Sequence, residues 1–124
     1  MSCILEFYED EHGRKPVLTW ITDELDPHAR RTLGTAMRQI LQEQGIDVCG
    51  TPFGRQLGEG LFEFRLRDAK VLLRVFCHAY GDRFVLLLSG YDKAQDPSKR
   101  RQKAEIAKAR SRLRVWTQRP RAAT

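Results

Sequence analysis

Strict alternation of apolar and charged side chains from Phe62 to Arg67 is the sequence feature that most constrains the fold of this chain. This period of two is typical of a strand with one buried face and one polar face. Two apolar runs follow, Val71 to Tyr80 and Arg83 to Tyr91, and the pairs Asp68-Ala69 and Gly81-Asp82 suit turns between the runs. The pattern therefore predicts three antiparallel strands in a meander.

If both turns are two-residue hairpin loops, Glu63 lies opposite Arg74, and Arg74 lies opposite Ser89. Directly opposed side chains share a face of a sheet. The apolar face then contains Phe62, Phe64, Leu66, Val71, Leu73, Val75, Cys77, Leu86 and Leu88. The polar face contains Glu63, Arg65, Arg67, Arg74, Ser89, Tyr91 and Lys93. A face with several cations, a carboxylate and a phenol indicates a site for a polyanion.

Two helices are expected before the meander. Pro16 suits the first turn of a helix, and apolar residues as far as Leu25 give this helix a buried side. Asp26 and Pro27 suit the N-cap and first position of the second helix, which is expected to end at Gln44-Gly45. Together they form a hairpin that can cover the apolar face of the sheet.

The segments around these elements are shorter and less regular. Residues Cys3 to Tyr8 are expected to form a first strand at or near an edge of the sheet. Residues 46–60 are expected to form a loop with turns, because glycine and proline recur in this segment. These residues are Gly50, Pro52, Gly54, Gly58 and Gly60.

A basic helix is expected to begin at Asp96-Pro97-Ser98 and to end near Thr117. Its apolar stripe consists of Ile106, Ala109, Leu113 and Trp116. Its other positions are mostly basic, and Glu105 is the one acidic residue among them. The predicted order is β-α-α-β-β-β-α, an α+β domain of residues 1–118 with a twisted antiparallel sheet, followed by a flexible tail at 119–124.

The net charge of +6 is unevenly distributed along the 124 residues. Residues 1–54 contain nine acidic and five basic side chains, whereas residues 55–124 contain seven acidic and seventeen basic ones. The basic second part indicates an anionic partner, most often a nucleic acid. The alternative is that these charges serve only solubility.

Several classes of protein and site are not expected. The chain has no apolar run long enough to span a membrane, and its start does not resemble a secretion signal. Three widely spaced cysteines favour reduced thiols and a cytoplasmic location. Neither the histidine and cysteine spacing of a metal site nor a glycine-rich phosphate loop occurs, so no metal or cofactor is expected.

The remaining chemistry that suits the polar face is metal-free phosphoryl transfer. RNA contains its own nucleophile, the 2′-hydroxyl beside the scissile phosphate. An enzyme has to orient this group, remove its proton and neutralise the charge that develops on the phosphate. Arginine binds phosphate oxygens through two donors, and Tyr, Glu or Lys can transfer protons.

Four segments resemble the motifs of a known family. They are Gly60-Leu61-Phe62-Glu63-Phe64-Arg65, Arg74-Val75-Phe76, Leu86-Leu87-Leu88-Ser89-Gly90-Tyr91-Asp92-Lys93 and Ala104-Glu105-Ile106-Ala107-Lys108-Ala109. Their order and composition resemble the phage-derived Gp49-like branch of the HigB/RelE toxin superfamily over residues 55–110. The chain has Tyr91 where the pattern usually has Phe, and Ala94 where it has a second Lys.

This resemblance implies a RelE-like fold and the toxin of a type II toxin–antitoxin pair. Such a toxin is an endoribonuclease that cuts mRNA on the ribosome and is neutralised, as a hetero-oligomer, by a small helix-turn-helix antitoxin. Carried over to this sequence, Arg74 binds the transition state, Arg65 and Lys93 bind phosphate, and Tyr91 or Glu63 transfers a proton. The residues expected to bind the RNA backbone are Arg65, Arg67, Lys99, Arg100, Arg101 and Lys103.

Each of these residues also has a structural interpretation. Glu63 and Arg74 can form an ion pair without a catalytic role, and Tyr91 can be a packed aromatic residue. The basic helix can be a charged surface held by its apolar stripe. Two other functions therefore stay open: a nucleic-acid-binding module that does not cleave, and a partner-binding subunit with the same fold.

Overall fold

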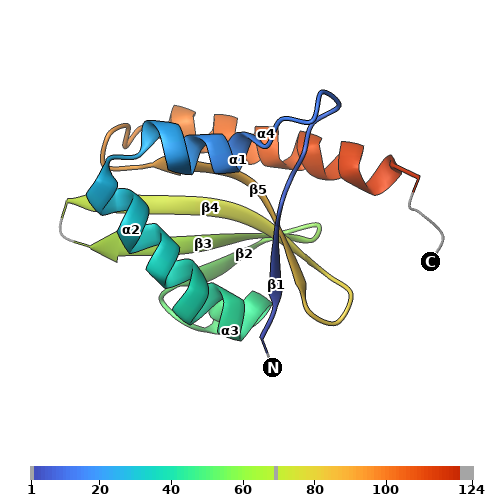
Figure 1. The fold of residues 1–124 in the computed structure, drawn as a ribbon, viewed down its shortest axis with the longest axis horizontal. Helices are drawn as coiled ribbons and strands as arrows, with labels where there is room; N and C mark the ends of the chain where they lie inside the picture. Colours follow the sequence, from blue (N-terminus) through green and yellow to red (C-terminus); the bar gives the residue numbers. More distant parts are fainter. Residues whose placement is uncertain (1, 69, 121–124) are drawn as a thin grey trace.

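The computed structural model of the chain describes residues 2–68 and 70–120. The elements are β1 (Ile4–Phe7), α1 (Pro16–Thr19), α2 (Pro27–Ala36), α3 (Gln42–Gln44), β2 (Gly54–Gly58), β3 (Leu61–Asp68), β4 (Val71–Tyr80), β5 (Phe84–Asp92) and α4 (Lys99–Gln118). The five strands form one sheet in the order β1-β5-β4-β3-β2 (Figure 1). The α+β class and the meander of β3, β4 and β5 are thereby confirmed.

The predicted fold was wrong at two places, the element order and the direction of one strand. Residues Gly54–Gly58 form a strand rather than a loop, because their backbone pairs antiparallel with β3. Gly54 is buried, and a Cβ at this position would lie 2.7 Å from Val48, so this glycine permits close packing rather than a turn. β1 pairs parallel with β5, so the sheet is mostly rather than wholly antiparallel.

The register of the meander differs from the predicted register because both turns lie at other residues than predicted. Asp68 pairs with Val71, and Tyr80 pairs with Phe84 across a three-residue loop. The first predicted turn includes Ala69, which lies outside the described residues. Because strand partners shift by two positions around Arg74, the side chains there keep their predicted face. Arg74 lies opposite Arg65 and Tyr91 instead of Glu63 and Ser89.

A β-bulge in β5 places Leu86 and Leu88 on the opposite face of the sheet from the predicted one. Phe76 pairs with Ser89 whereas Cys77 pairs with Leu87, so Leu88 is an extra residue in β5. Residues before the bulge therefore face the other way from the prediction. Leu86 and Leu88 pack on the same side as Phe76, next to α4, instead of under the helical hairpin.

Apolar side chains form two cores, one on each side of the sheet. The first lies under the helical hairpin, and its helical members are Val17, Trp20, Ile21, Leu25, Ala29, Leu33, Ala36, Met37 and Leu41. The second lies between the sheet and α4, where Ala109 is buried and the rest of the predicted apolar stripe is partly buried. Figure 1 shows α2 and α3 lying across the sheet and α4 running along β5.

The predicted helix boundaries are largely confirmed. α1 continues as a π-helical turn to Glu24, and Asp26 caps α2 by accepting a hydrogen bond from the backbone N of Ala29 at 2.8 Å. Gly45, at φ +55°, ends α3, and a 3₁₀ helix, Gly45–Gly50, follows where a loop was predicted. α4 begins later than the cap-plus-proline pair Asp96-Pro97 predicted, because Ser98 is the cap and accepts a hydrogen bond from the backbone N of Arg101 at 3.1 Å.

Of the predicted tail, residues 119–124, the structure describes residues 119 and 120. The Arg119 guanidinium lies 5.2 Å from the centroid of the Tyr8 ring, so this residue packs against the domain. Residues 121–124 lie outside the described residues. No helix in the described ranges has the length and apolar character needed to cross a membrane.

Replacing Gly90 by alanine is expected to lower the free energy of unfolding by about 1–3 kcal/mol. A Cβ on Gly90 would lie 2.4 Å from Cζ3 of Trp20, a ring that is buried in the first core. Urea unfolding of the variant measures the effect. Gly50→Ala is the matched control, because a Cβ there has no atom within 4 Å among the described residues. Equal stability of the two variants would contradict this account of the Gly90 contact.

Candidate functional site

Alternation in three neighbouring strands builds the polar face of the sheet. Glu63 and Arg65 extend from β3, Arg74 from β4 and Tyr91 from β5. Arg74 lies between Arg65 and Tyr91 in the strand register. The structure therefore brings together four of the residues that the sequence predicted for the site.

The Glu63 carboxylate is the centre of an arginine cluster. Its Oε2 lies 3.2 Å from Nε of Arg65 and 3.6 Å from Nε of Arg55, and its Oε1 lies 3.5 Å from Nε of Arg74. The Glu63 side chain is only 1% exposed. Three guanidinium groups therefore surround one buried carboxylate, which leaves an excess of positive charge on this face.

Arg55 was missed in the sequence analysis as a member of this cluster. It lies in β2, directly opposite Glu63 in the strand register. The glycines around it indicated a loop, so no face could be assigned to its side chain. The spacing of Phe53, Arg55 and Leu57 at every second residue is compatible with a strand, but it is too short to outweigh the glycines.

Arg74 is the most deeply placed cation of the cluster, with 8% of its surface exposed. Burial lowers its pKa, while the negative charge of Glu63 opposes this change. Arginine remains charged at neutral pH in spite of such a shift. Its Nη1 donates a hydrogen bond to the carbonyl of Leu73 at 3.3 Å, which fixes the direction of the guanidinium.

A hollow of about 310 Å³ opens beside the cluster. It is lined by Pro52, Phe53, Arg65, Arg67, Leu72 and Arg74. Three of these six residues are arginines, from β3 and β4, and no acidic side chain is among them. A phosphate group matches the charge of this hollow, since guanidinium groups bind phosphate oxygens through paired donors.

Tyr91 lies under the surface of the site. It is fully buried and stacks on Phe76 with a centroid distance of 6.3 Å. The Arg101 guanidinium of α4 covers its ring at 5.1 Å from the centroid. Burial raises the pKa of the phenol, and the positive charge of Arg74 opposes this rise. A phenol with a raised pKa remains protonated at neutral pH, so it can donate a hydrogen bond, but it releases its proton less readily than a free tyrosine.

Three buried polar atoms of the site have no hydrogen-bond partner within residues 2–68 and 70–120: Glu63 Oε1, Arg65 Nε and the Tyr91 hydroxyl. The ion pairs of Glu63 and Arg65 satisfy charge but not hydrogen-bond geometry. Buried polar groups without partners are costly and uncommon in native proteins. Their concentration beside a cationic hollow indicates a place where a ligand or water completes the bonding.

The remaining predicted site residues lie around the cluster rather than in it. Arg67 is exposed at the rim of the hollow, and Lys93 follows the last residue of β5 with its backbone N bonded to the carbonyl of Leu72 at 2.7 Å. Lys99, Arg100 and Lys103 are exposed on the first turns of α4. Among these predicted residues of α4, Arg101 contacts the site directly, through the Tyr91 ring.

Glu105 was also missed, although it is the one acidic residue in a basic helix. It is 5% exposed and accepts hydrogen bonds from Ser89 Oγ, from Arg101 Nε at 2.9 Å and from Lys108 Nζ at 3.4 Å. Burial raises its pKa, but the hydrogen bonds from Ser89 and Arg101 outweigh burial, so the net pKa is lowered. Glu105 thereby holds Arg101 in place over Tyr91.

The chemistry open to this site uses fixed positive charge and proton transfer. Within the described ranges, no group of three or more His, Cys, Asp or Glu side chains is arranged to bind a metal ion. The arginines can stabilise a phosphorane-like transition state, since preorganised donors act most strongly where charge develops. The Glu63 and Tyr91 side chains provide an acceptor and a donor for protons beneath them.

Comparison with known protein families identifies the family of this chain. The sequence model of the family described as phage-derived protein Gp49-like (DUF891) matches residues 21–114. The match therefore includes β2 to β5, most of α4 and every residue of the arginine cluster. No curated protein matches the chain.

Proposed function

Because the chain belongs to the Gp49-like family of phage-derived proteins, which is part of the RelE/HigB-like toxin group, we propose that it is the toxin of a type II toxin–antitoxin system. The proposed activity is metal-independent cleavage of mRNA on the ribosome, which stops translation. The proposed fold type is RelE-like, and the proposed location is the cytoplasm. The proposed inhibitor is a small helix-turn-helix antitoxin that binds the toxin directly.

One observation supports this function above the others: buried polar atoms of Glu63, Arg65 and Tyr91 without hydrogen-bond partners lie next to the arginines that line the cationic hollow, and Arg65 itself lines it. In the proposed reaction the RNA 2′-oxygen forms a bond to phosphorus, and the bond from phosphorus to the 5′-oxygen breaks. The 2′-hydroxyl loses its proton to a base and the 5′-oxygen gains one. The products are a 2′,3′-cyclic phosphate and a 5′-hydroxyl.

The proposed roles are those that the sequence resemblance implies. Arg74 stabilises the charge of the transition state, while Arg65 and Lys93 hold the phosphate. Glu63 or Tyr91 transfers the proton. The residues proposed to bind the RNA backbone on either side are Arg67, Lys99, Arg100, Arg101 and Lys103.

A second candidate function is RNA binding without cleavage. The burial of Glu63 and Tyr91 favours it, since neither side chain reaches the surface as long as Arg65, Arg74 and Arg101 keep their positions. In this case the same arginines provide affinity for RNA, and no residue transfers a proton.

Expression of the chain without an antitoxin is expected to stop growth and to create new mRNA 5′ ends within translated regions. The 5′ ends are mapped by sequencing RNA from induced and uninduced cells, and 5′-hydroxyl ends are expected at the new positions. A soluble protein that binds RNA but produces no new 5′ ends would support the second candidate and contradict cleavage.

A further inference from the structure

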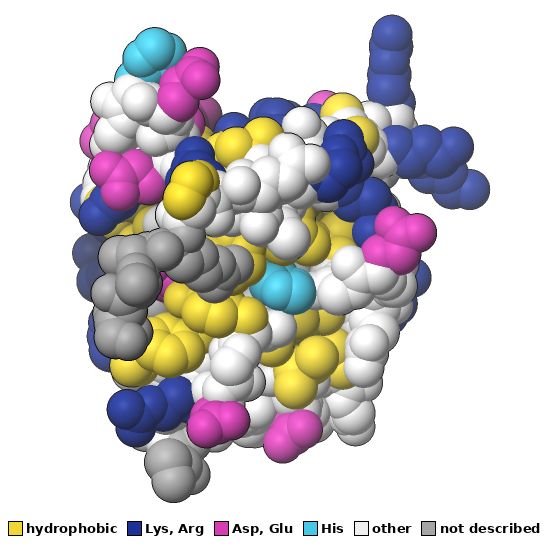
Figure 2. Space-filling model, turned by 90° about the vertical axis from the view of Figure 1, so that its right-hand side faces the viewer, with side chains coloured by type: hydrophobic (Ala, Val, Ile, Leu, Met, Phe, Trp, Pro, Cys, Tyr) yellow, Lys and Arg dark blue, Asp and Glu magenta, His cyan; other side chains and the backbone are white. Residues whose placement is uncertain are grey.

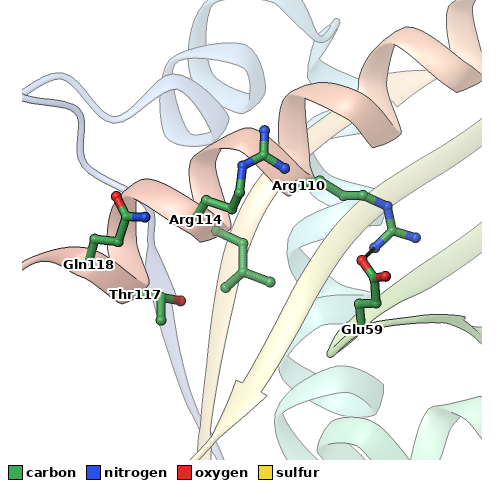
Figure 3. Close-up of a pocket in the computed structure, with 6 residues that line it drawn as sticks. Glu59, Arg110, Arg114, Thr117 and Gln118 are labelled. Atoms are coloured by element: carbon green, nitrogen blue, oxygen red, sulfur yellow. Dashed lines mark ion pairs between the residues drawn. The ribbon is translucent and has the colours of Figure 1, made fainter.

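A second hollow lies between the last turns of α4 and the turn that joins β2 to β3 (Figure 3). Its volume is about 280 Å³. It is lined by Glu59, Arg110, Leu113, Arg114, Thr117 and Gln118. None of these residues belongs to the arginine cluster or to the RNA-binding residues proposed above.

Arg110 fixes one wall of this hollow. Its Nη2 donates a hydrogen bond to the carbonyl of Leu57 at 2.9 Å, and its Nη1 donates one to the carbonyl of Gly58 at 3.2 Å. Nη1 also lies 3.7 Å from Oε2 of Glu59. Figure 3 shows the Arg110 side chain extending from α4 to Glu59 across this gap. The hollow is therefore preformed by contacts between two distant segments.

The turn opposite Arg110 has an unfavourable backbone conformation. Glu59 has φ +54° and is the one non-glycine residue with positive φ in the described part of the chain. Its neighbours Gly58 and Gly60 have φ +88° and +82°. Gly58 pairs with Leu61, so Glu59 and Gly60 form a two-residue hairpin loop, and such a loop requires positive φ at both of its residues. The bonds from Arg110 to this turn hold it against α4.

Arg114 provides the charge that this hollow offers to a ligand. It is exposed, lies one turn after Arg110 on α4, and has no hydrogen-bond or ion-pair partner within the described ranges. Leu113 gives the hollow an apolar wall, while Thr117 and Gln118 supply a hydroxyl and an amide. This combination fits a nucleotide: the guanidinium binds phosphate, the apolar wall contacts a base and the polar groups bond its edge.

The position of α4 connects this hollow with the arginine cluster. Arg101 covers Tyr91 near one end of α4, and Arg114 follows it by thirteen residues. At a rise of 1.5 Å per residue the two positions lie about 20 Å apart along the helix. An RNA strand that runs along α4 and is long enough to span this distance reaches both positions.

We infer that the hollow between α4 and the β2–β3 turn is a second RNA-binding site, which holds a nucleotide of the same strand whose scissile phosphate lies at the arginine cluster. The inference takes its ligand class from the proposed function. A protein partner fits less well, because only Leu113 among the lining residues is apolar and the centre of a protein interface is mainly apolar. Figure 2 views the molecule from the side on which α4 ends, and Lys and Arg side chains project at the upper right of this view.

The test compares RNA strands that differ in length. Fluorescence anisotropy measures binding of single-stranded 2′-O-methyl RNAs of 4 and 12 nucleotides, which cannot be cleaved because they lack the nucleophilic hydroxyl. Arg114→Ala is expected to weaken binding of the longer RNA about fivefold and to leave the shorter one unchanged. For the longer RNA, the slope of log binding constant against log salt concentration should be shallower for Arg114→Ala than for wild type, by about one phosphate contact.

Arg31→Ala on α2 removes one exposed positive charge away from both hollows and is the matched control. The inference is overturned if the Arg114 variant loses affinity equally for both lengths, if the control loses as much, or if wild-type protein binds both lengths equally. Loss of antitoxin binding with unchanged RNA binding would overturn it too, by assigning the surface to a protein.

The outcomes for the second site and for the proposed function are separable, since the binding assay requires no cleavage. A chain that needs Arg114 to bind the longer RNA but creates no new mRNA 5′ ends has the second site without the proposed activity. A chain that cleaves mRNA while Arg114→Ala binds both RNAs like wild type has the activity without the second site.

Discussion

Replacing Arg74 by alanine is expected to lower the rate of RNA cleavage about 100- to 1,000-fold, the usual effect of removing one preorganised donor from a transition state. Arg74 lines the cationic hollow, and its guanidinium is fixed by the Leu73 carbonyl and the Glu63 carboxylate. Cells that express the variant should grow, and sequencing of their RNA should show almost no new 5′ ends.

Two further variants test this interpretation of Arg74. Arg74→Lys retains the charge but not the paired donors, so an intermediate rate is expected. Arg31→Ala removes an exposed charge on α2 and should cleave like wild type. Circular dichroism and thermal melting verify that each variant is folded. A folded Arg74→Ala protein that still arrests growth would exclude the proposed role.

Replacing Glu63 by glutamine is expected to lower the free energy of unfolding by about 3 kcal/mol, because removing one partner from a buried ion pair leaves the other charge uncompensated. Arg74 is the partner that loses most, since it is 8% exposed, whereas the Arg55 side chain is 50% exposed and regains contact with water. Urea unfolding of the purified proteins measures the difference.

Glu59→Gln is the matched control for this change. Glu59 also pairs with an arginine, but its side chain is 86% exposed, and exposed ion pairs contribute at most about 1 kcal/mol. If Glu63→Gln unfolds at the same urea concentration as wild type but no longer cleaves RNA, the carboxylate acts in proton transfer and not in holding the arginines. If it is unstable and retains cleavage, the carboxylate is structural.

Glu63 and Arg74 also illustrate what the sequence pattern could and could not predict about the site. Alternation from Phe62 to Arg67 predicted that Glu63, Arg65 and Arg67 share a face, and the structure confirms that face with Arg74 and Tyr91 on it. The prediction that Glu63 lies directly opposite Arg74 was wrong, because it depended on the length and position of the turn between their strands. The ion pair between them nevertheless forms along the diagonal of the sheet.

Other features depended on contacts between distant parts of the chain. Arg55 joins the cluster only because β2 pairs with β3, and its glycine-rich surroundings gave no reason to expect a strand. Leu86 and Leu88 changed sides because of a bulge that pairing with β4 imposes on β5. Glu105 reaches Ser89 and Arg101 only because α4 packs on the sheet.

The sequence by itself determined the α+β class, the two helices before the meander, the apolar stripe of the last helix and the polar face of three strands. Each of these follows from a local period or a local cap, which neighbouring residues specify. The tertiary structure decided the extra strand, the parallel pairing of β1, the bulge and the burial of Tyr91 and Glu63. These depend on which distant backbone groups pair and which surfaces lose contact with water, and no local period encodes either choice.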